Sequence, residues 1–511
     1  MSTSFNLIDE PWIPCTDPTG KVVELGIRET LANAHRLTEI SGDSPIVTVA
    51  LHRLLLAILH RVVEGPTDIR QWSRLWADGK GRWENTTLDE YLTKQHDNFE
   101  LFDPERPFYQ AADERVKEKS VASMVMDAAS GNNGTLFDHH TEAGGLSLTP
   151  AQAARHLLAA QSFGLAGLSG LDQKFTYAPC VGGILFLVQG KTLFQTLLLN
   201  MVRYGKDEPI PKLGDDLPTW EAADPYAERS LPNGYLDYLT WQNRRILLKP
   251  EVGLDGVTRV RNMTMAPGLR MDGEVQNPMM HYDANNKAER SFPLRFSESK
   301  ALWRDSSALF KLRTEGIRPP LSVDWLATLS SNGKIEKSET RRISALGMVN
   351  DQAKMEFFRG ERMPLRNEYL EDKTLVEALD SALKMAEDVA RQLWGSARTL
   401  ATFLVAPESD SPEGNKPQKE DLNQKMGPWG IERRYWARLE APFMVTLETL
   451  PDDSSIALRN WQETLKRTAW QSLDSITESL GTSPRALKAT VQARGQLAAG
   501  LTKVFPKETT L

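Results

Sequence analysis

The sequence has few cysteines and no long apolar run, and each shortage excludes a class of protein. Its two cysteines, Cys15 and Cys180, are too few for a disulfide framework or an all-cysteine metal site, so we expect reduced thiols in a cytoplasm. Uninterrupted apolar stretches such as 184–188 have the length of a strand, well below the roughly 18 residues that cross a bilayer. Asp9 and Glu10 stand where a signal peptide would have basic and then apolar residues, so we expect no membrane partner.

The chain also lacks an excess of positive charge. It has 61 basic and 68 acidic residues, a net charge of −7, which by itself argues against a surface coated by nucleic acid. Its 511 residues are too many for one hydrophobic core, and 40% of them are hydrophobic. The composition indicates a folded protein of two or three domains and excludes a disordered chain or a coiled-coil rod.

The first 370 or so residues mix short strands and helices. We expect strands at 5–8 and 21–25, a buried helix at 46–63, and a helix that begins at Thr149 and Pro150, where threonine is a good N-cap. We also expect a strand at 182–188, a helix at 193–202 and a long surface connection at 209–235.

Beyond residue 373 apolar residues recur at helical spacing, and no strand pattern remains. Ser483 and Pro484 predict the start of a last helix with Leu487, Val491 and Leu497 on its apolar face. The sequence therefore predicts an α+β fold in two domains. A large mixed α/β domain covers 1–372, and a four-helix bundle covers 373–511 with a mobile insert near 407–427.

The densest glycine run spans 164–170 and follows a helix. It lacks the lysine and hydroxyl of a Walker loop, and phosphate loops follow strands rather than helices. Two interpretations stay open: a tightly packed turn, or a loop whose free backbone N–H groups let a ligand approach closely.

Histidine and acidic residues are adjacent at two places, His96 with Asp97 and Asp138 with His139 and His140. Adjacent side chains point in different directions on a regular element, and no second ligand group lies at metal spacing. We therefore expect no metal and no cofactor. A metal-dependent nuclease that uses these residues remains an alternative hypothesis.

Basic residues cluster in spite of the acidic total. Each cluster fits either a solvated surface of mixed charge or a phosphate-binding face. The sequence Asn350-Asp351-Gln352-Ala353 fits either a polar turn or a tip whose amide reads or wedges apart bases. The clusters comprise Arg244, Arg245, Arg259, Arg261, Arg270, Arg341, Arg342, Lys354, Arg359, Arg362, Arg366, Arg485, Lys488, Arg494 and Lys503.

In combination these motifs resemble those of a known family, the large (CasA) subunit of the type I-E CRISPR Cascade surveillance complex. The resemblance rests on the opening segment 5–14, on 107–110, on the region of Phe137, on 161–170 and on 350–353, in the family's order. It covers essentially the whole chain. It implies a non-catalytic subunit that reads the protospacer-adjacent motif in duplex DNA, starts strand separation for R-loop formation and helps recruit the CRISPR nuclease-helicase.

The resemblance also implies roles for individual residues. Gln352 matches a wedge glutamine, with Asn350, Asp351 and Ala353 on the same hairpin. The glycine loop that approaches the motif corresponds to Gly164, Ala166 and Gly167. Phe137 matches an aromatic residue that contributes to motif recognition and docks to the 5′ end of the crRNA.

Two features depart from the family pattern. The family's lysine finger falls between residues 259 and 272, where this sequence has no lysine, so Arg270 or Arg261 is expected to replace it. Some relatives carry a cysteine-rich cluster, which two cysteines cannot form.

The expected partners are target DNA, the crRNA 5′ region, the other Cascade subunits and the nuclease-helicase. A purely structural scaffold remains the third hypothesis.

Overall fold

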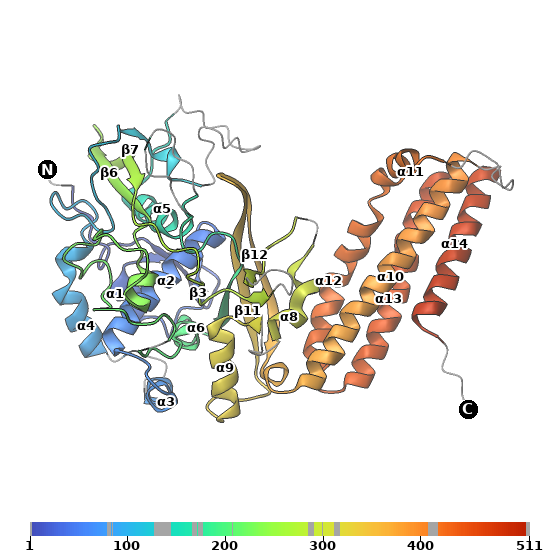
Figure 1. The fold of residues 1–511 in the computed structure, drawn as a ribbon, viewed down its shortest axis with the longest axis horizontal. Coiled ribbons are helices and arrows are strands. Elements are labelled where there is room, and N and C mark those ends of the chain that lie inside the picture. The colour runs from blue at the N-terminus through green and yellow to red at the C-terminus, as the bar shows by residue number, and fades with distance from the viewer. Residues whose placement is uncertain are drawn as a thin grey trace. The chain divides into compact units, whose positions relative to one another are not determined.

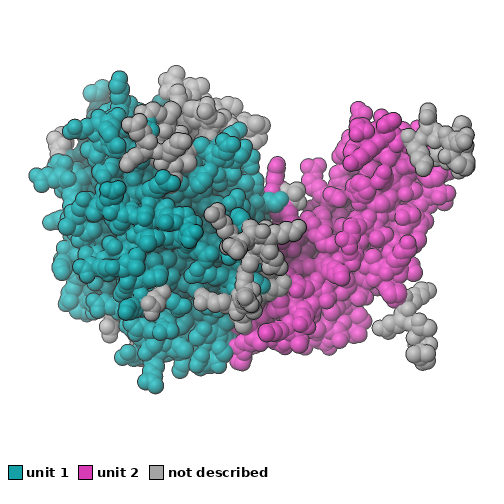
Figure 2. All heavy atoms as spheres, in the orientation of Figure 1, with its two compact units in different colours: residues 1–297, 312–336, 341–362 teal, residues 298–311, 337–340, 363–511 magenta. Residues whose placement is uncertain are grey.

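The computed structural model describes residues 3–78, 83, 85–126, 145–165, 171, 177–206, 208–284, 291–298, 300–310, 317–406 and 417–506 (Figure 1). The chain forms two compact units, coloured separately in Figure 2. The first unit consists of residues 1–297, 312–336 and 341–362. The second consists of residues 298–311, 337–340 and 363–511, so it includes two short segments that precede the helical region. The fold is mixed helix and sheet with a helical C-terminal region, which confirms the predicted class.

An apolar helix, α2, forms much of the interior of the first unit. Helix α2 is almost entirely buried, as its apolar sequence predicts, and it packs against α5 and α7. Its length and apolar content would suffice to cross a membrane, but 78% of the apolar window is buried inside the protein, as in the core helix of a folded domain. The helices are α1 (Ile27–Ala32), α2 (Pro45–Val63), α3 (Ile69–Asp78), α4 (Asn85–Lys94), α5 (Pro150–Phe163), α6 (Leu193–Asn200), α7 (Tyr235–Leu239) and α9 (Leu321–Ser331).

In the described part of the chain the strands form four three-stranded sheets, in the orders β2-β1-β3, β4-β7-β6, β10-β8-β9 and β12-β11-β5. Two of them contain long hairpins, β6–β7 and β11–β12. The strands are β1 (Ile13–Thr16), β2 (Val22–Leu25), β3 (Glu39–Ile40), β4 (Lys119–Ser120), β5 (Leu185–Gln189), β6 (Arg244–Val252), β7 (Thr258–Pro267), β8 (Tyr282–Ala284), β9 (Ser291–Pro293), β10 (Ile317–Arg318), β11 (Thr340–Asp351) and β12 (Lys354–Arg366).

The predicted strand at 5–8 is wrong, because those residues form a turn in which the Asn6 side chain accepts a hydrogen bond from the Ile8 N–H. The strand that pairs with β2 is instead β1. The start of α5 is as predicted. Thr149 and Gln152 form a reciprocal capping box, which satisfies the first N–H groups of the helix.

The second unit contains the bundle helices α10 (Lys373–Val405), α12 (Ile431–Thr449), α13 (Ser454–Thr477) and α14 (Pro484–Val504), with the short helices α8 (Ser306–Phe310) and α11 (Lys419–Met426). Two aromatic side chains inside the bundle form hydrogen bonds with the backbone of α10. The Tyr435 hydroxyl donates to the Ala386 carbonyl at 3.0 Å, and the Trp461 indole donates to the Ala382 carbonyl at 2.9 Å.

Two details of the bundle differ from the prediction. Leu487 and Val491 are exposed, and the buried face of α14 consists mainly of alanines with Leu497. These small residues let α14 approach α10 closely, and a Cβ at Gly500 would lie 2.6 Å from the Gln392 side chain. The insert predicted at 407–427 includes helix α11, which buries Leu422 and Met426, and its residues 407–416 lie outside the described part of the chain.

Candidate nucleic-acid interface

The predicted wedge residues form the tip of the β11–β12 hairpin. The base of β11 is fixed in the sheet, since residues 342–346 pair with β5. Gln352 lies six residues beyond Leu346, so the tip extends about 20 Å past the last of these pairs at roughly 3.3 Å per residue. Asp351, Gln352 and Ala353 are all exposed. The hairpin therefore presents its tip away from the sheet that anchors it.

Gln352 adopts an uncommon backbone conformation. Its φ is +49°, in the left-handed region where glycine or asparagine is usual and where other residues are strained by roughly 1–2 kcal/mol. Its carbonyl accepts two hydrogen bonds, from Asn350 Nδ2 at 2.8 Å and from the Tyr177 hydroxyl at 3.2 Å. Its side-chain amide bonds to no residue that the structure describes. The two hydrogen bonds to the Gln352 carbonyl thus hold the turn, and the side-chain amide of Gln352 remains available to a ligand.

Tyr177 connects this tip to the segment that begins the glycine run. The next residue, Ala178, donates its backbone N–H to the Gly164 carbonyl at 3.0 Å. Gly164 is buried, and its own N–H donates to the Ala160 carbonyl at 2.9 Å. The free backbone N–H expected of the glycine run is therefore not at Gly164. Ala166 and Gly167 lie outside the described residues.

Gly164 is needed for close packing against an arginine. A Cβ at this position would lie 2.6 Å from the Ala160 carbonyl oxygen and 3.1 Å from the guanidinium of Arg244. That guanidinium donates to the Leu165 carbonyl at 2.6 Å and to the Asn243 carbonyl at 3.0 Å. Burial lowers the pKa of Arg244 to about 9. Arg244 thus fixes the start of the glycine run from the protein interior rather than facing solvent.

The Gln161 side chain reinforces this junction. Its amide accepts from the Arg244 N–H at 2.9 Å and donates to the Arg244 carbonyl at 2.8 Å, as a neighbouring strand would. On the far side of Arg244, the Gly268 N–H donates to the Asn243 carbonyl at 2.9 Å. Residues 268 and 269 therefore bond to residues 242 and 243, directly before β6.

Arg270 follows residues 268 and 269 in sequence. It is exposed and makes no hydrogen bond or ion pair with any residue in the described ranges. Arg261, on β7, is also exposed, but its guanidinium lies 3.5 Å from the Glu251 carboxylate. Arg270 thus has the freer charge of the two candidates for the lysine-finger position.

Hydrogen bonds therefore join parts of the chain that are far apart in sequence. We call residues 164–165, 177–178, 242–244, 268–270 and 350–353 the linked segments. They include Gln352, Gly164 and Arg270, three of the residues predicted from sequence. Arg261 is on the neighbouring hairpin, and Phe137 lies outside the described residues.

The sequence-based prediction missed Tyr177 and the role of Arg244. Arg244 was grouped only with the surface basic clusters, although it is 2% exposed. Tyr177 follows the glycine run by a few residues, and an aromatic residue so close to that run is the feature of the sequence that could have identified it as part of the site. Several other clustered arginines are paired with acids: Arg259 with Asp255, Arg362 with Glu39, and Arg366 with Glu368 and Asp452.

His96, one of the histidines of the nuclease hypothesis, is part of a network of polar contacts at the surface. His96 Nε2 lies 3.1 Å from Asp9, and Nδ1 lies 3.4 Å from Asp97. Asp9 also pairs with Arg28 at 3.0 Å. Within the described ranges, no group of three or more His, Cys, Asp or Glu residues has a metal-binding arrangement. Asp138, His139 and His140 lie outside those ranges.

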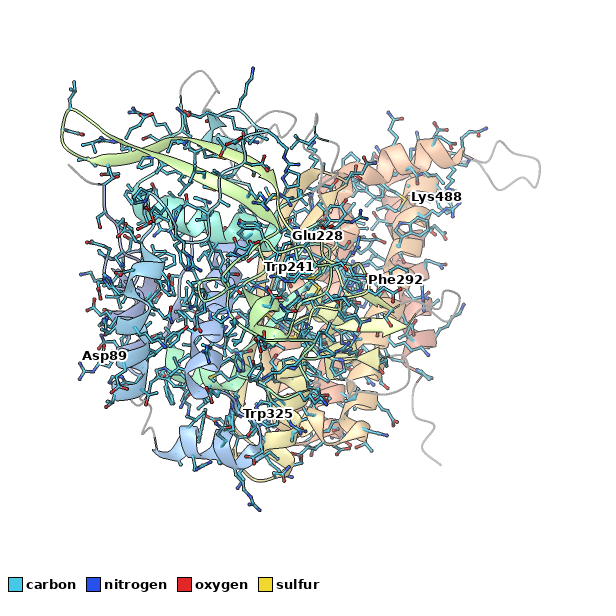
Figure 3. All side chains as sticks on the ribbon, turned by 60° about the vertical axis from the view of Figure 1, so that its left-hand side comes forward. Asp89, Glu228, Trp241, Phe292, Trp325 and Lys488 are labelled. Atoms are coloured by element: carbon cyan, nitrogen blue, oxygen red, sulfur yellow. The ribbon has the colours of Figure 1, made fainter. Side chains whose placement is uncertain are left out.

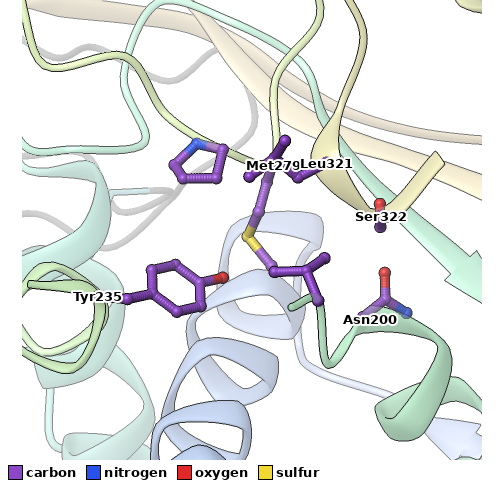
Figure 4. A pocket seen from close by; sticks show the side chains of 7 residues that line it. Asn200, Tyr235, Met279, Leu321 and Ser322 are labelled. Carbon is purple, nitrogen blue, oxygen red and sulfur yellow. The ribbon is translucent and has the colours of Figure 1, made fainter. Parts of the chain in front are cut away.

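A small internal cavity lies next to Tyr235, Met279 and Leu321 (Figure 4). Its volume of about 10 Å³ is on the order of what one water molecule requires. Asn200, which also lines it, already donates to the Val188 and Thr196 carbonyls at 2.7 Å. The cavity is too small for an organic cofactor.

Comparison with known proteins identifies relatives across nearly the whole chain. A family model of the CRISPR-associated protein Cse1 matches residues 6–472. The chain is 36% identical over 510 residues to the CRISPR-associated protein CasA/Cse1 of Thermus thermophilus, covering 96% of this chain and 95% of that protein. The crystal structure of T. thermophilus CasA is similar with a TM-score of 0.79 at 31% identity, over 98% of this chain and 100% of that one.

More distant relatives share the fold. The crystal structure of CRISPR-associated protein Cse1 from Acidimicrobium ferrooxidans has a TM-score of 0.83 at 24% identity and covers 99% of both chains. A chain of a CRISPR RNA-guided surveillance complex has a TM-score of 0.74 at 23% identity, over 97% of this chain and 100% of that one.

Proposed function

The chain belongs to the CRISPR-associated Cse1 family, as its sequence motifs predicted, and we propose that it is the DNA-recognition subunit of a type I-E Cascade surveillance complex. In this role it reads the protospacer-adjacent motif in duplex DNA, starts strand separation and helps recruit the nuclease-helicase, without catalysing a reaction itself. The observation that carries the proposal is the exposed Gln352 tip, which hydrogen bonds connect through Tyr177 and residues 164–165 to Arg244.

The proposed opening step uses Gln352 as a wedge. A side chain inserted between two base pairs must offset a few kcal/mol of unstacking. Two features keep the tip in position when it enters the duplex. One is the sheet that anchors β11, and the other is the pair of hydrogen bonds to the Gln352 carbonyl. Guide RNA then replaces one strand of the DNA duplex at nearly balanced free energy, so a small initial opening is enough to nucleate the R-loop. No nucleotide hydrolysis is required.

Motif reading is assigned to the minor groove. That groove presents a degenerate pattern of donors and acceptors, so a backbone loop with one or two side chains tolerates several motif sequences. Arg270 is the preferred replacement for the family's lysine finger because its charge is free, and Arg261 is the second choice. Asn350, Asp351 and Ala353 lie at or beside the tip, and we assign Ala166 and Gly167 to the same motif-reading role.

The remaining assignments follow from family membership. A relative of the same fold is a chain of a CRISPR RNA-guided surveillance complex, so we assign the other Cascade subunits and crRNA as partners in the cytoplasm. Phe137 is assigned to the crRNA 5′ end. Helix α14 contains Arg485, Lys488, Arg494 and Lys503 and no acidic residue, and Arg494 pairs with Asp474 of α13. We assign this basic helix to contact with the displaced strand.

The direct test uses the complete RNA–protein complex assembled with and without this chain. Electrophoretic binding and permanganate reactivity are measured on duplexes that carry or lack the motif. We expect selective binding and opening of the motif-bearing duplex only when the chain is present. Opening that is equal without the chain would support the scaffold hypothesis. Metal-dependent cutting by the purified chain would support the nuclease hypothesis.

A further inference from the structure

Tyr177 is an exposed aromatic residue fixed beside the proposed wedge. Its side chain is 44% exposed, although most aromatic residues in the described part of this unit are buried. Its hydroxyl donates to the Gln352 carbonyl at 3.2 Å. This hydrogen bond holds the Tyr177 ring at the tip of the β11–β12 hairpin, although Tyr177 belongs to a different segment of the chain.

The backbone that follows Tyr177 is firmly attached. The N–H groups of Ala178 and Cys180 donate to the carbonyls of Gly164 at 3.0 Å and Ser162 at 2.9 Å, at the end of α5. Asn277 Nδ2 donates to the Pro179 carbonyl at 3.0 Å. Since hydrogen bonds anchor both the backbone that follows Tyr177 and its hydroxyl, the exposed ring has little freedom to move.

A fixed, exposed ring beside a base-separating tip has the chemistry of a stacking platform. Aromatic side chains bind unpaired bases through their faces, without preference for sequence, because every base has a π-face. A tyrosine loses little conformational entropy on binding since it has only two side-chain torsions. Lys354, directly after the turn, is exposed and bonds to no residue in the described ranges, so its charge is available to a nearby phosphate.

We propose that Tyr177 is a binding site for a single unpaired nucleobase, the first base released when Gln352 enters the duplex. This proposal rests on the proposed function and extends it. The wedge disrupts one base step, and the ring of Tyr177 captures the base before it can pair again. Capture by stacking is independent of base identity, as a surveillance complex that accepts any target sequence requires.

The test uses the assembled complex and a target duplex with 2-aminopurine at the first position beside the motif. In solution this base becomes fluorescent when it leaves the helix, and stacking on a ring quenches it. We compare wild type with Tyr177→Phe, Tyr177→Trp and Tyr177→Leu. The matched control is Phe292→Leu, which removes another exposed ring of the same unit, 49% exposed and labelled in Figure 3.

We expect Tyr177→Leu to slow R-loop formation by about tenfold, in line with the loss of one base–ring stack, and to leave the released 2-aminopurine unquenched. Tyr177→Phe and Tyr177→Trp retain a ring, so both are expected to keep quenching and most of the rate. Phe292→Leu should behave as wild type. Complex assembly and thermal unfolding, measured for every variant, verify that each protein folds.

Two results would overturn the inference. Wild-type rate and quenching in Tyr177→Leu would exclude a base site at this ring. Equal defects in Tyr177→Phe and Tyr177→Leu would show that the hydroxyl acts only as a support for the turn. Failure of the proposed function itself is distinguishable, because Gln352→Ala would then open the motif-bearing duplex as fast as wild type.

Discussion

The two long hairpins, β6–β7 and β11–β12, are closed by different turns: five residues, 253–257, connect β6 to β7, and two residues, Gln352 and Ala353, connect β11 to β12. In β6–β7 a glycine, Gly256, takes the positive φ of +77°, and the Gly253 and Gly256 N–H groups bond within the turn. Side chains follow both of its yellow-green strands to the tip in Figure 3. In β11–β12 the positive φ belongs to Gln352, and the turn is held from outside by Tyr177.

The surfaces of the two tips differ as well. Val252, Leu254 and Val257 are exposed at the β6–β7 tip, where nearby charges are paired as Asp255 with Arg259. The β11–β12 tip is polar, and its amide is unused. A hairpin that keeps a strained glutamine where glycine would be easier indicates that the side chain, rather than the turn, is required. Under the proposed function, this difference favours Gln352 over Leu254 as the residue that opens DNA.

The largest expected effect comes from removing that side chain. Gln352→Ala should slow R-loop formation by roughly ten- to hundredfold, because a wedge that offsets a few kcal/mol of unstacking is lost. Leu254→Ala, at the other tip, should leave the rate unchanged. Stopped-flow measurement on the assembled complex compares them. A slower rate in Leu254→Ala with a normal rate in Gln352→Ala would reverse the assignment.

Glycine substitutions separate packing from turn geometry. Gly164→Ala places a Cβ against the Ala160 carbonyl and the Arg244 guanidinium, so we expect the free energy of unfolding to fall by about 1–3 kcal/mol, with slower R-loop formation. Gly256→Ala meets no atom within 4 Å but retains a positive φ, so it should cost about 1 kcal/mol without affecting the DNA step. The measurements are denaturant unfolding and the rate of R-loop formation for both variants. Equal impairment of opening by the two variants would contradict this expectation.

A milder change tests the strain itself. Gln352→Asn should raise the free energy of unfolding by roughly 0.5–1 kcal/mol, because asparagine tolerates the left-handed region better than glutamine. The shorter side chain should still slow R-loop formation. Thermal unfolding and R-loop kinetics measure the two effects. A variant that gained stability and kept the full rate would show that the reach of Gln352 does not matter.

The smallest expected effect distinguishes the two arginines. Arg270→Ala should reduce the slope of log K against log salt by about 1, since a free guanidinium that contacts a phosphate releases about one counterion. Arg261→Ala should reduce it less, because Glu251 already neutralises part of that charge. Titrations of motif-bearing duplex at several salt concentrations provide the slopes. A larger change for Arg261→Ala would move the finger position to β7.

Much of the fold follows from local sequence. The N-caps at Thr149 and Ser483 and the spacing of apolar residues in α10 and α13 are short-range signals, and the structure bears them out. The buried face of α14 could not be predicted from hydrophobicity, since close packing at Gly500 selects alanines over Leu487 and Val491.

The site is only partly predictable for a similar reason. The turn residues at 350–353 and the glycine run are visible as motifs, but Tyr177 reaches Gln352 across 175 positions of sequence. No periodicity encodes such a contact. The net charge of −7 also gave little guidance, because pairing with acids removes arginines such as Arg362 from the free surface while Arg270 remains available.

The position of Gln352 on DNA can be measured by disulfide trapping. Both native cysteines are buried, and burial raises the pKa of Cys15 to about 12, so neither competes with an introduced thiol. Complexes that carry Gln352→Cys or Leu254→Cys are mixed with duplexes bearing a thiol tether at single positions. We predict that Gln352→Cys crosslinks at the first base step beside the motif and that Leu254→Cys does not. Crosslinking at that step by Leu254→Cys alone would contradict the account.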